Sequence, residues 1–312
     1  MTLQISVVIP VYNAARFIKI AVESALAQPE VAEIILVEDG SEDQSLIQCK
    51  HLVQIYDRVV LYTHPNNVNK GAGASRNLGI KNSSFDYIAF LDADDYYLPG
   101  RFEAENRIFE EHKDVDGVYG ALGSELLDDF ARDKKEETVT TVSGNVPPER
   151  LFYEMAPIGQ SGWFSGVALT VKKNAFQRTG LFDVELRLSQ DTHMWIKMAL
   201  KLKLVPGECG IPVAVRGIHQ GNRVHNSSKI MEYRPTLFRK LLEWYSQDRG
   251  CDDKTLILWD NYLKYYLIVH NPGRTGKVFF LIRAVIQFPF LASNRCFWQQ
   301  WPLLGRIWKQ HQ

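Results

Sequence analysis

Apolar residues in the first third of the chain gather into short runs of strand length. These runs lie within residues 5–12, 33–41, 58–63 and 87–92. Runs without polar alternation are typical of strands that are covered on both faces, as in parallel sheets. Between them, apolar residues recur three and four positions apart, as in residues 13–28, where Asn13 is suited to cap a helix. The alternation predicts an α/β fold with a mostly parallel sheet and helices on both faces.

Later segments extend this pattern. Residues 124–148 are charged and contain proline and glycine, which predicts a solvated excursion with a hairpin. Residues 166–183 predict a strand, a short helix and a turn. Residues 189–202 have the pattern of an amphipathic helix, and residues 211–228 that of a strand leading into a basic loop.

Polar side chains cluster where three of the predicted strands end. The clusters are Tyr12–Asn13, Glu38–Ser41 and Asp92–Asp95. In open parallel sheets, ligands bind beside the carboxyl ends of the strands. Three clusters at such ends therefore predict a binding site along one edge of the sheet.

The third cluster contains the carboxylates of Asp92, Asp94 and Asp95. In an extended segment, side chains at i and i+2 point the same way, so Asp92 and Asp94 are expected to converge and Asp95 to face away. Two convergent carboxylates suit Mg²⁺ or Mn²⁺, which takes its other ligands from substrate phosphates and water. The alternative is that these residues cap the helix predicted after Pro99–Gly100.

Composition and charge argue against several classes of protein. A net charge of zero gives no basic field that would favour nucleic acid. The four cysteines are widely spaced, which fits neither a zinc site nor a disulfide framework and favours a reducing, cytoplasmic compartment. Residues 1–13 lack a basic region and a long apolar stretch, so we interpret them as a first strand and not as a signal peptide.

Charge is distributed unevenly along the chain. Residues 1–229 carry 24 basic and 30 acidic side chains, and residues 230–312 carry 12 and 6. We therefore expect a domain at 1–229 and a helical extension at 230–312. Residues 261–312 hold seven basic side chains, no acidic ones and many aromatic ones, which predicts a helix that lies on an anionic membrane surface. The alternative is a helical subdomain packed on the first domain.

Seven motifs follow one another in order: VVIPVYN, VEDGS, GAGASRNLGI, FLDADD, SGVALTVKKNAFQRTGLFD, SQDTHMWIKM and VRGIHQGN. Together they resemble family 2 glycosyltransferases, which have the GT-A fold, and the resemblance spans roughly residues 5–226. The resemblance implies an inverting enzyme that moves a sugar from a nucleotide diphosphate sugar to a hydroxyl acceptor. UDP is the expected nucleotide because it is frequent in the family.

The resemblance implies a nucleoside pocket lined by Pro10, Tyr12, Glu38 and Asp39. The family usually has two aspartates where this chain has Glu38–Asp39, a difference that bears on base selectivity. The alternative for these two acids is an acidic turn in which Ser41 caps the next helix.

Three further residues are implied at the phosphates and the metal. Arg76 is expected to approach the nucleotide or its phosphates, and its alternative is a surface arginine on a helix. Asp92 is expected to reach the ribose or the metal, and Asp94 to ligate the Mn²⁺ or Mg²⁺.

Asp191 matches the family's catalytic base, which takes the proton of the acceptor hydroxyl while that oxygen attacks the anomeric carbon. Its alternative is an acid at a helix N-terminus, favoured by the helix dipole. Gln190 stands where the family commonly has Glu, and it is expected to contact the acceptor together with Trp163. A tryptophan of the core is the alternative for Trp163.

Arg216, His219 and Asn222 match an Arg-x-x-His-x-x-Asn arrangement. They are expected to hold the departing diphosphate, whose negative charge grows as the glycosidic bond breaks. The family often has Ser two residues after the Asn, where this chain has Val224.

The expected function is cell-envelope polysaccharide or glycolipid synthesis on a saccharide or lipid-linked acceptor, at the inner face of the cell membrane. One alternative is a nucleotidyltransferase, which usually carries a glycine-rich loop after its first strand, whereas PVYNAARF contains no glycine. The other is a non-catalytic nucleotide-sugar-binding protein, which has no need of Asp92, Asp94 and Asp191 together.

Overall fold

The computed structural model describes residues 3–127, 139–142, 146–219, 227–247 and 252–288. Contacts within the chain divide it into two compact units, Met1–His225 and Asn226–Gln312. Much of the predicted excursion at 124–148, the loop with Asn222 and Val224, and the last part of the basic tail lie outside the described residues.

The first unit is built on a mixed sheet in which parallel pairs predominate. Its strands, in spatial order, are β3 (Val59–Thr63), β2 (Val31–Glu38), β1 (Ile5–Val11), β4 (Tyr87–Phe90), β8 (Leu169–Lys172), β6 (Gly117–Tyr119) and β9 (Leu204–Pro206). Strands β3, β2, β1 and β4 are parallel, β8 is antiparallel to β4 and β6, and β9 is parallel to β6. The predicted mostly parallel sheet is confirmed, and β1, β2 and β4 end at the same edge of it.

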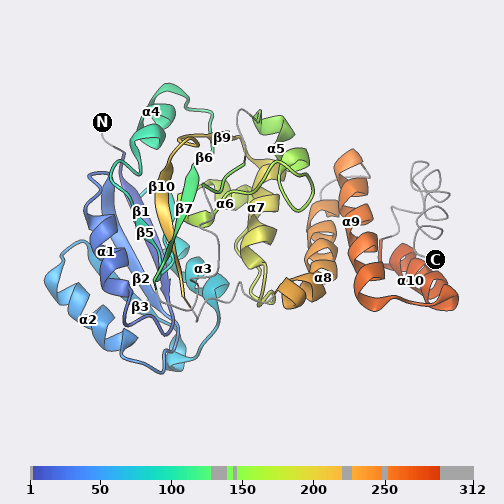
Figure 1. Cartoon of the computed structure of the whole chain (residues 1–312), viewed down its shortest axis with the longest axis horizontal. Coiled ribbons are helices and arrows are strands. Elements are labelled where there is room, and N and C mark those ends of the chain that lie inside the picture. Colours follow the sequence, from blue (N-terminus) through green and yellow to red (C-terminus); the bar gives the residue numbers. More distant parts are fainter. Residues whose placement is uncertain (1–2, 128–138, 143–145, 220–226, 248–251, 289–312) are drawn as a thin grey trace. The chain divides into compact units, whose positions relative to one another are not determined.

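Helices cover both faces of this sheet (Figure 1). They are α1 (Ile18–Leu26), α2 (Ser45–Ile55), α3 (Ala72–Asn82), α4 (Glu103–Glu111), α5 (Pro148–Glu154), α6 (Ala175–Thr179) and α7 (Gln190–Lys201), with single 3₁₀ turns at Pro65–Asn67 and Gly166–Ala168. Val7 of β1 shares a buried cluster with Val22 of α1 and Leu52 of α2. Val8 faces the opposite side, where a Cβ added at Gly79 of α3 would overlap its side chain. Glycine at this position therefore lets α3 lie close to the sheet.

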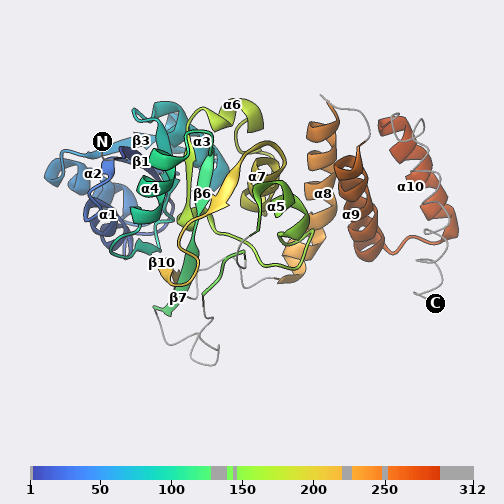
Figure 2. The same cartoon turned by 90° about the horizontal axis from the view of Figure 1, so that it is seen from above.

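A second, smaller sheet joins β5 (Tyr96–Tyr97), β10 (Pro212–Ile218) and β7 (Ala121–Leu126) in that order. Strand β10 is antiparallel to β5 and parallel to β7, beside which it runs in Figure 2. Because β5 directly follows Asp92–Asp95, this sheet places the end of β10 beside those carboxylates.

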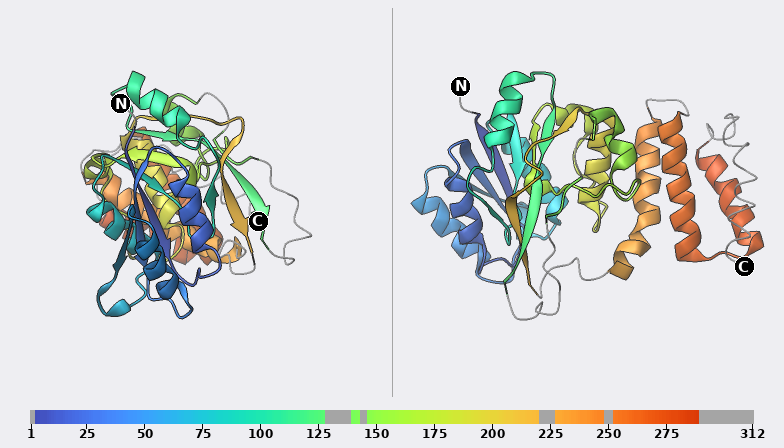
Figure 3. Two further views of the ribbon diagram at one scale, coloured as in Figure 1. Left: turned by 90° about the vertical axis from the view of Figure 1, so that its left-hand side faces the viewer. Right: turned by 45° about the horizontal axis from the view of Figure 1, so that its top comes forward.

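The second unit contains α8 (Ser227–Ser246), α9 (Asp253–His270) and α10 (Arg274–Gln287) among its described residues, and α8 and α9 lie side by side (Figure 3). Aromatic packing joins α10 to α9, since the Phe280 ring stacks on Tyr266 and Trp259 with centroid distances of 3.8 and 6.1 Å. Asp252 caps α9 by accepting a hydrogen bond from the Thr255 N–H at 2.8 Å. Within the described part of the chain, no helix is long and apolar enough to cross a membrane.

Candidate active site

The loops that follow β1 and β2 are tied together by Asn13. Its N–H donates to Ser41 Oγ at 3.0 Å, and its Oδ1 accepts from the Glu42 N–H at 2.9 Å. Asn13 has a φ of 50°, a left-handed conformation that asparagine tolerates better than most residues. The prediction that Asn13 caps α1 is wrong, because its side chain serves the neighbouring loop and the helix begins only at Ile18.

The predicted nucleoside pocket lies at the ends of these two strands. Pro10 pairs with Val37 across β1 and β2, and Tyr12 follows β1 as an exposed ring. An exposed aromatic ring beside a polar loop is available to stack on a planar ligand. The position of Tyr12 is therefore compatible with the prediction that it lines the nucleoside pocket, and its contact with a nucleoside stays a prediction.

Glu38 and Asp39 are buried, and backbone amides hold both carboxylates. Glu38 accepts from the N–H groups of Gly40 at 3.1 Å and Ser41 at 2.6 Å. Asp39 accepts from the N–H groups of Lys70 at 2.7 Å and Gly71 at 2.8 Å. The acidic turn named as the alternative is thus present.

Ser41, however, does not cap the next helix. Its hydroxyl accepts the Asn13 N–H, and α2 starts after Gln44 without a side-chain cap. The two acids therefore fix the loops that surround the predicted pocket, and their contact with a nucleoside stays a prediction.

Arg76 projects from α3 to the carboxylate cluster. Its Nη2 lies 2.5 Å from Asp92 Oδ1, its side chain is 10% exposed, and its guanidinium lies 5.6 Å from the centre of the Phe182 ring. Arg76 is therefore not a surface arginine of the helix. Its Nε is buried without a hydrogen-bond partner among the described residues, which leaves a donor that a phosphate oxygen could satisfy.

Residues Asp92–Asp95 form a turn, so the expectation that this segment is extended is wrong. Strand β4 ends at Phe90, and the Asp95 N–H donates to the Asp92 carbonyl oxygen at 3.1 Å. The side chains of Asp92 and Asp94 are 42% and 28% exposed, whereas Asp95 is buried. The predicted separation of Asp95 from the other two is present, but the turn produces it. None of the three caps α4, whose N-cap is Phe102.

Asp94 is paired with His219, which follows β10. His219 Nε2 lies 3.0 Å from Asp94 Oδ2, and its ring packs on Phe17 at a centroid distance of 4.7 Å. Burial, with the charge of Asp92 as the next cause, raises the pKa of Asp94, and the hydrogen bond from His219 opposes the rise. Crowded, partly buried carboxylates of this kind are stabilised by a cation.

The donor set at Asp92 and Asp94 fits a divalent ion that shares its ligands with a substrate. Within the described ranges, no three His, Cys, Asp or Glu side chains are grouped as a site made of protein ligands alone. Mg²⁺ commonly binds one or two carboxylates and completes its shell with phosphate and water, and Mn²⁺ accepts the same hard oxygen ligands. Two carboxylates at the end of a strand are therefore sufficient for this type of site.

Asp191 lies in the first turn of α7 and is exposed, with its Oδ1 accepting from the Thr192 N–H at 2.7 Å. The preceding Ser189 is left-handed, with a φ of 57°. The neighbouring Gln190 rests on α3, since a Cβ added at Gly73 would overlap its Oε1. The start of α7 is thus held on the helix that also carries Arg76 to Asp92.

A second contact fixes the loop before α7 to α3. Asn77 Nδ2 donates to the Phe182 carbonyl oxygen at 2.8 Å, and Asn77 Oδ1 accepts from the Phe182 N–H at 2.9 Å. Sequence reasoning missed this pair and the seat of Gln190 on Gly73. A glycine in GAGAS and an asparagine after Arg76 were the visible signals, but neither shows which distant segment it meets.

Trp163 is not a core tryptophan. Its side chain belongs to the exposed set, at 40%, whereas Phe164 and Trp195 are buried and lie 6.0 Å apart between ring centroids. An exposed indole can stack on a sugar ring. The contact with an acceptor stays a prediction.

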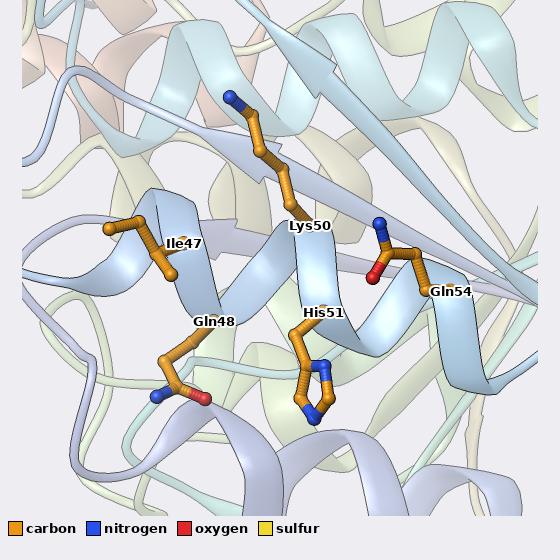
Figure 4. A pocket seen from close by; sticks show the side chains of 5 residues that line it. All are labelled: Ile47, Gln48, Lys50, His51 and Gln54. Atoms are coloured by element: carbon orange, nitrogen blue, oxygen red, sulfur yellow. The ribbon is translucent and has the colours of Figure 1, made fainter.

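A shallow depression lies outside this constellation, on the surface of α2. It is lined by Ile47, Gln48, Lys50, His51 and Gln54 (Figure 4). All five side chains come from one helix, and none belongs to the predicted site. The depression therefore has no part in the chemistry argued below.

Comparison with known proteins agrees with this arrangement. Residues 6–157 match the model of the family described as Glycosyl transferase family 2. An uncharacterized glycosyltransferase of Rickettsia felis is 32% identical over 196 residues, which cover 62% of this chain and 31% of that relative. The minor teichoic acid biosynthesis protein GgaB of Bacillus subtilis is 39% identical over 111 residues, or 35% of this chain and 12% of GgaB.

The chain carries a glycosyltransferase family 2 domain. The structure of residues 1–349 of TarS of S. aureus in complex with UDP-GlcNAc is similar with a TM-score of 0.65 and 18% identity, over 85% of this chain and 73% of that one. This likeness confirms the predicted GT-A fold. The chain spans about a third of the length of the Rickettsia felis relative.

The family match covers one part of the predicted site. The matched range holds the predicted nucleoside, phosphate and metal residues, from Pro10 to Asp94. Asp191, Arg216 and His219 lie beyond it, and their roles stay predictions. The structure brings Gln190, the neighbour of Asp191, against α3 and His219 beside Asp94.

Proposed function

We propose that this chain is an inverting, metal-dependent glycosyltransferase that moves a sugar from a UDP-sugar to a hydroxyl acceptor in cell-envelope polysaccharide or glycolipid synthesis. The observation that carries the proposal is that α3 supports both halves of the site. Arg76 of α3 reaches Asp92, and Gly73 of α3 receives Gln190, the neighbour of Asp191. The teichoic acid protein and the UDP-GlcNAc complex among the similar proteins support the setting and the donor class.

Asp92 and Asp94 would hold Mn²⁺ or Mg²⁺, which supplies positive charge to the donor's diphosphate when it is bound. The guanidinium of Arg76, next to Asp92, would bind a phosphate oxygen through its Nε, which has no hydrogen-bond partner among the described residues. Arg216 and His219, at the end of β10, would hold the diphosphate as it departs. Positive charge and N–H donors at this point stabilise the negative charge that develops on the leaving group.

Asp191 would act as the base. An exposed carboxylate in the first turn of α7 can receive an acceptor hydroxyl and take its proton as that oxygen attacks the anomeric carbon. Attack from the face opposite the diphosphate inverts the anomeric configuration. Trp163 and Gln190 would contact a saccharide or lipid-linked acceptor.

The second unit is proposed to bring the enzyme to an anionic membrane surface on the cytoplasmic side. Helix α10 exposes Phe279, Ile282 and Ile286 at spacings of three and four residues, and Arg283 is exposed beside them. An apolar stripe with cations, in a segment from 261 onward without acids, has the character of an interfacial helix. The proposed boundary between the catalytic domain and this extension, at 229/230, lies four residues after the division of the two compact units.

The proposal is tested by product analysis with a panel of UDP-sugars and Mn²⁺. Release of UDP with an inverted sugar linkage supports it, whereas formation of UTP and sugar 1-phosphate when pyrophosphate is added would indicate a nucleotidyltransferase instead. Binding of a UDP-sugar without turnover would indicate a non-catalytic binding protein. Asp94→Asn is expected to abolish metal-stimulated turnover, and Asp86→Asn, an acid just before β4, is the control that leaves it unchanged.

A further inference from the structure

The third carboxylate of the cluster, Asp95, has no place in the chemistry described above. Its side chain is buried, in contrast to Asp92 and Asp94. Its Oδ1 accepts a hydrogen bond from the Gly217 N–H of β10 at 3.0 Å. The bond joins residues that lie far apart in the sequence and that flank two groups of predicted site residues.

The strand register explains why this bond forms. Strands β5 and β10 are antiparallel, with Tyr97 opposite Ala214 and Tyr96 opposite Val215. Continued by one step, this register sets Asp95 opposite Arg216, and a further step sets Asp94 opposite Gly217.

The close approach at Gly217 agrees with that register. A Cβ added at Gly217 would overlap the carbonyl oxygen of Asp94. The backbone after β10 therefore lies directly against the carboxylate turn, and no other residue fits at position 217 without moving one of the two segments.

The position of Gly217 also determines where Arg216 and His219 lie. Arg216 is close enough for its charge to act on Asp95, and His219 reaches Asp94 with Nε2 at 3.0 Å from Oδ2. If the end of β10 moved away from the turn, both the guanidinium and the imidazole would leave the diphosphate side of the site. The Asp95–Gly217 bond is placed to prevent that movement.

The cost of burying Asp95 is evident from its surroundings. The carboxyl of Asp95 is buried in the turn that also carries Asp92 and Asp94, and it accepts the Gly217 N–H there. A third carboxylate in such a place is unfavourable unless hydrogen bonds and nearby positive charge compensate for its burial.

We propose that Asp95 is a positioning residue that fixes the end of β10, with Arg216 and His219, against the turn that carries Asp92 and Asp94. This inference rests on the proposed function, because it assigns these residues to a metal–diphosphate site. Asp95 itself contacts neither the metal nor the substrate. Its loss separates two halves of the site that must meet for the metal to strengthen nucleotide binding.

The test compares Asp95→Ala with Asp95→Asn by calorimetry of UDP binding with and without Mn²⁺. Both variants remove the ionisable carboxyl, but asparagine keeps an Oδ1 that can accept the Gly217 N–H. We expect Mn²⁺ to tighten UDP binding about tenfold or more in the wild type, and we call this ratio of affinities the Mn²⁺ factor. Asp95→Ala should lose most of the Mn²⁺ factor, and Asp95→Asn should keep the larger part of it.

The matched control is Asp116→Ala. Asp116 is also buried, accepts a backbone hydrogen bond from the Lys203 N–H at 2.8 Å and pairs with Arg178, away from the predicted site residues. It is expected to lower the melting temperature while the Mn²⁺ factor stays at the wild-type value. Gly217→Ala keeps Asp95 but forces the two backbones apart, so it is expected to lose the Mn²⁺ factor. This variant replaces Asp95→Ala in the test if Asp95→Ala does not fold.

The outcomes separate the two proposals. A folded Asp95→Ala or Gly217→Ala protein with the wild-type Mn²⁺ factor overturns the positioning role and leaves the proposed function standing. Equal losses in Asp95→Ala and Asp95→Asn also overturn it, because charge and not the hydrogen bond then accounts for the effect. A wild type in which Mn²⁺ has no effect on UDP binding overturns the metal-dependent function and this inference together.

Discussion

Gln190 occupies the space that a side chain at Gly73 would need. The contact links the start of α7, where Asp191 lies, to the first turn of α3. Because Arg76 on the same helix binds Asp92, the position of α3 affects both the predicted base and the predicted metal residues.

Gly73→Ala is expected to displace Gln190 and to lower kcat with little change in stability. The atom that would overlap is the end of a flexible side chain, so the fold can adjust, and alanine favours the helix by roughly 1 kcal/mol over glycine. We expect kcat to fall about tenfold, since a small displacement of a catalytic group has effects of this order or larger. Turnover and thermal unfolding are the measurements.

Gly79→Ala is the matched control in the same helix. Its new methyl group would overlap Val8 in the core, so it is expected to destabilise the protein by about 1–3 kcal/mol. Unchanged kcat in Gly73→Ala would show that the contact of Gln190 with Gly73 does not affect the reaction.

Asp191→Asn is expected to lower kcat by about 10²–10⁴-fold while UDP-sugar binding stays unchanged, because the amide cannot accept the hydroxyl proton. The control is Glu185→Gln, which changes an exposed acid in the loop before α7. Single-turnover rates and equilibrium binding are measured for both variants. A turnover number in Asp191→Asn equal to that of the wild type would remove the base assignment.

Lys197 of α7 is buried and donates a hydrogen bond to the Leu181 carbonyl oxygen at 3.2 Å. Burial lowers the pKa of Lys197 from 10.5 to about 8, and the charge of Asp183 opposes this only in part. Between these two values the unfolded chain binds more protons than the folded one, so the free energy of unfolding contributed by Lys197 rises with pH from about 8 to 10.5. Lys197→Met, which keeps the apolar stem, should lose this rise.

The measurement is urea unfolding of both proteins at pH 7, 8.5 and 10. The variant is expected to be the more stable at pH 7, by up to about 3 kcal/mol, and the difference to shrink as pH rises. Taking the difference cancels other groups, such as Cys49, whose pKa burial raises to about 12. Parallel stability curves for the two proteins would contradict the prediction.

Membrane binding is predicted to depend on α10. The double substitution Ile282→Ser and Ile286→Ser removes two exposed apolar side chains and should weaken binding to phosphatidylglycerol vesicles about tenfold or more. Ile47→Ser with Ile55→Ser, two exposed positions on α2, is the control. Co-sedimentation at low and high salt measures binding, and equal binding of both double variants and the wild type would count against the membrane surface.

The sequence allowed the sheet and its strand-end clusters to be predicted because long apolar runs determine both. It failed where a local pattern competes with a distant contact. Asn13 has the chemistry of a helix cap, but the loop after β2 takes its side chain. Asp92–Asp95 continues a strand-like run, yet the approach of Gly217 requires a turn there. Neither contact has a signature within the segment that makes it.

The ion pair of Arg76 with Asp92 has a consequence for the order in which ligands enter. An incoming divalent cation competes with the arginine for the same carboxylate oxygen, so the cation alone should bind weakly. A nucleotide offers the displaced guanidinium a new anion, which makes joint entry favourable where separate entry is not. We therefore expect Mn²⁺ to bind more than tenfold more weakly without UDP than with it, a difference of about 1.4 kcal/mol or more. Arg76 would thus act as the counter-ion of Asp92 until a ligand with a phosphate group binds the arginine and frees the carboxylate for the metal.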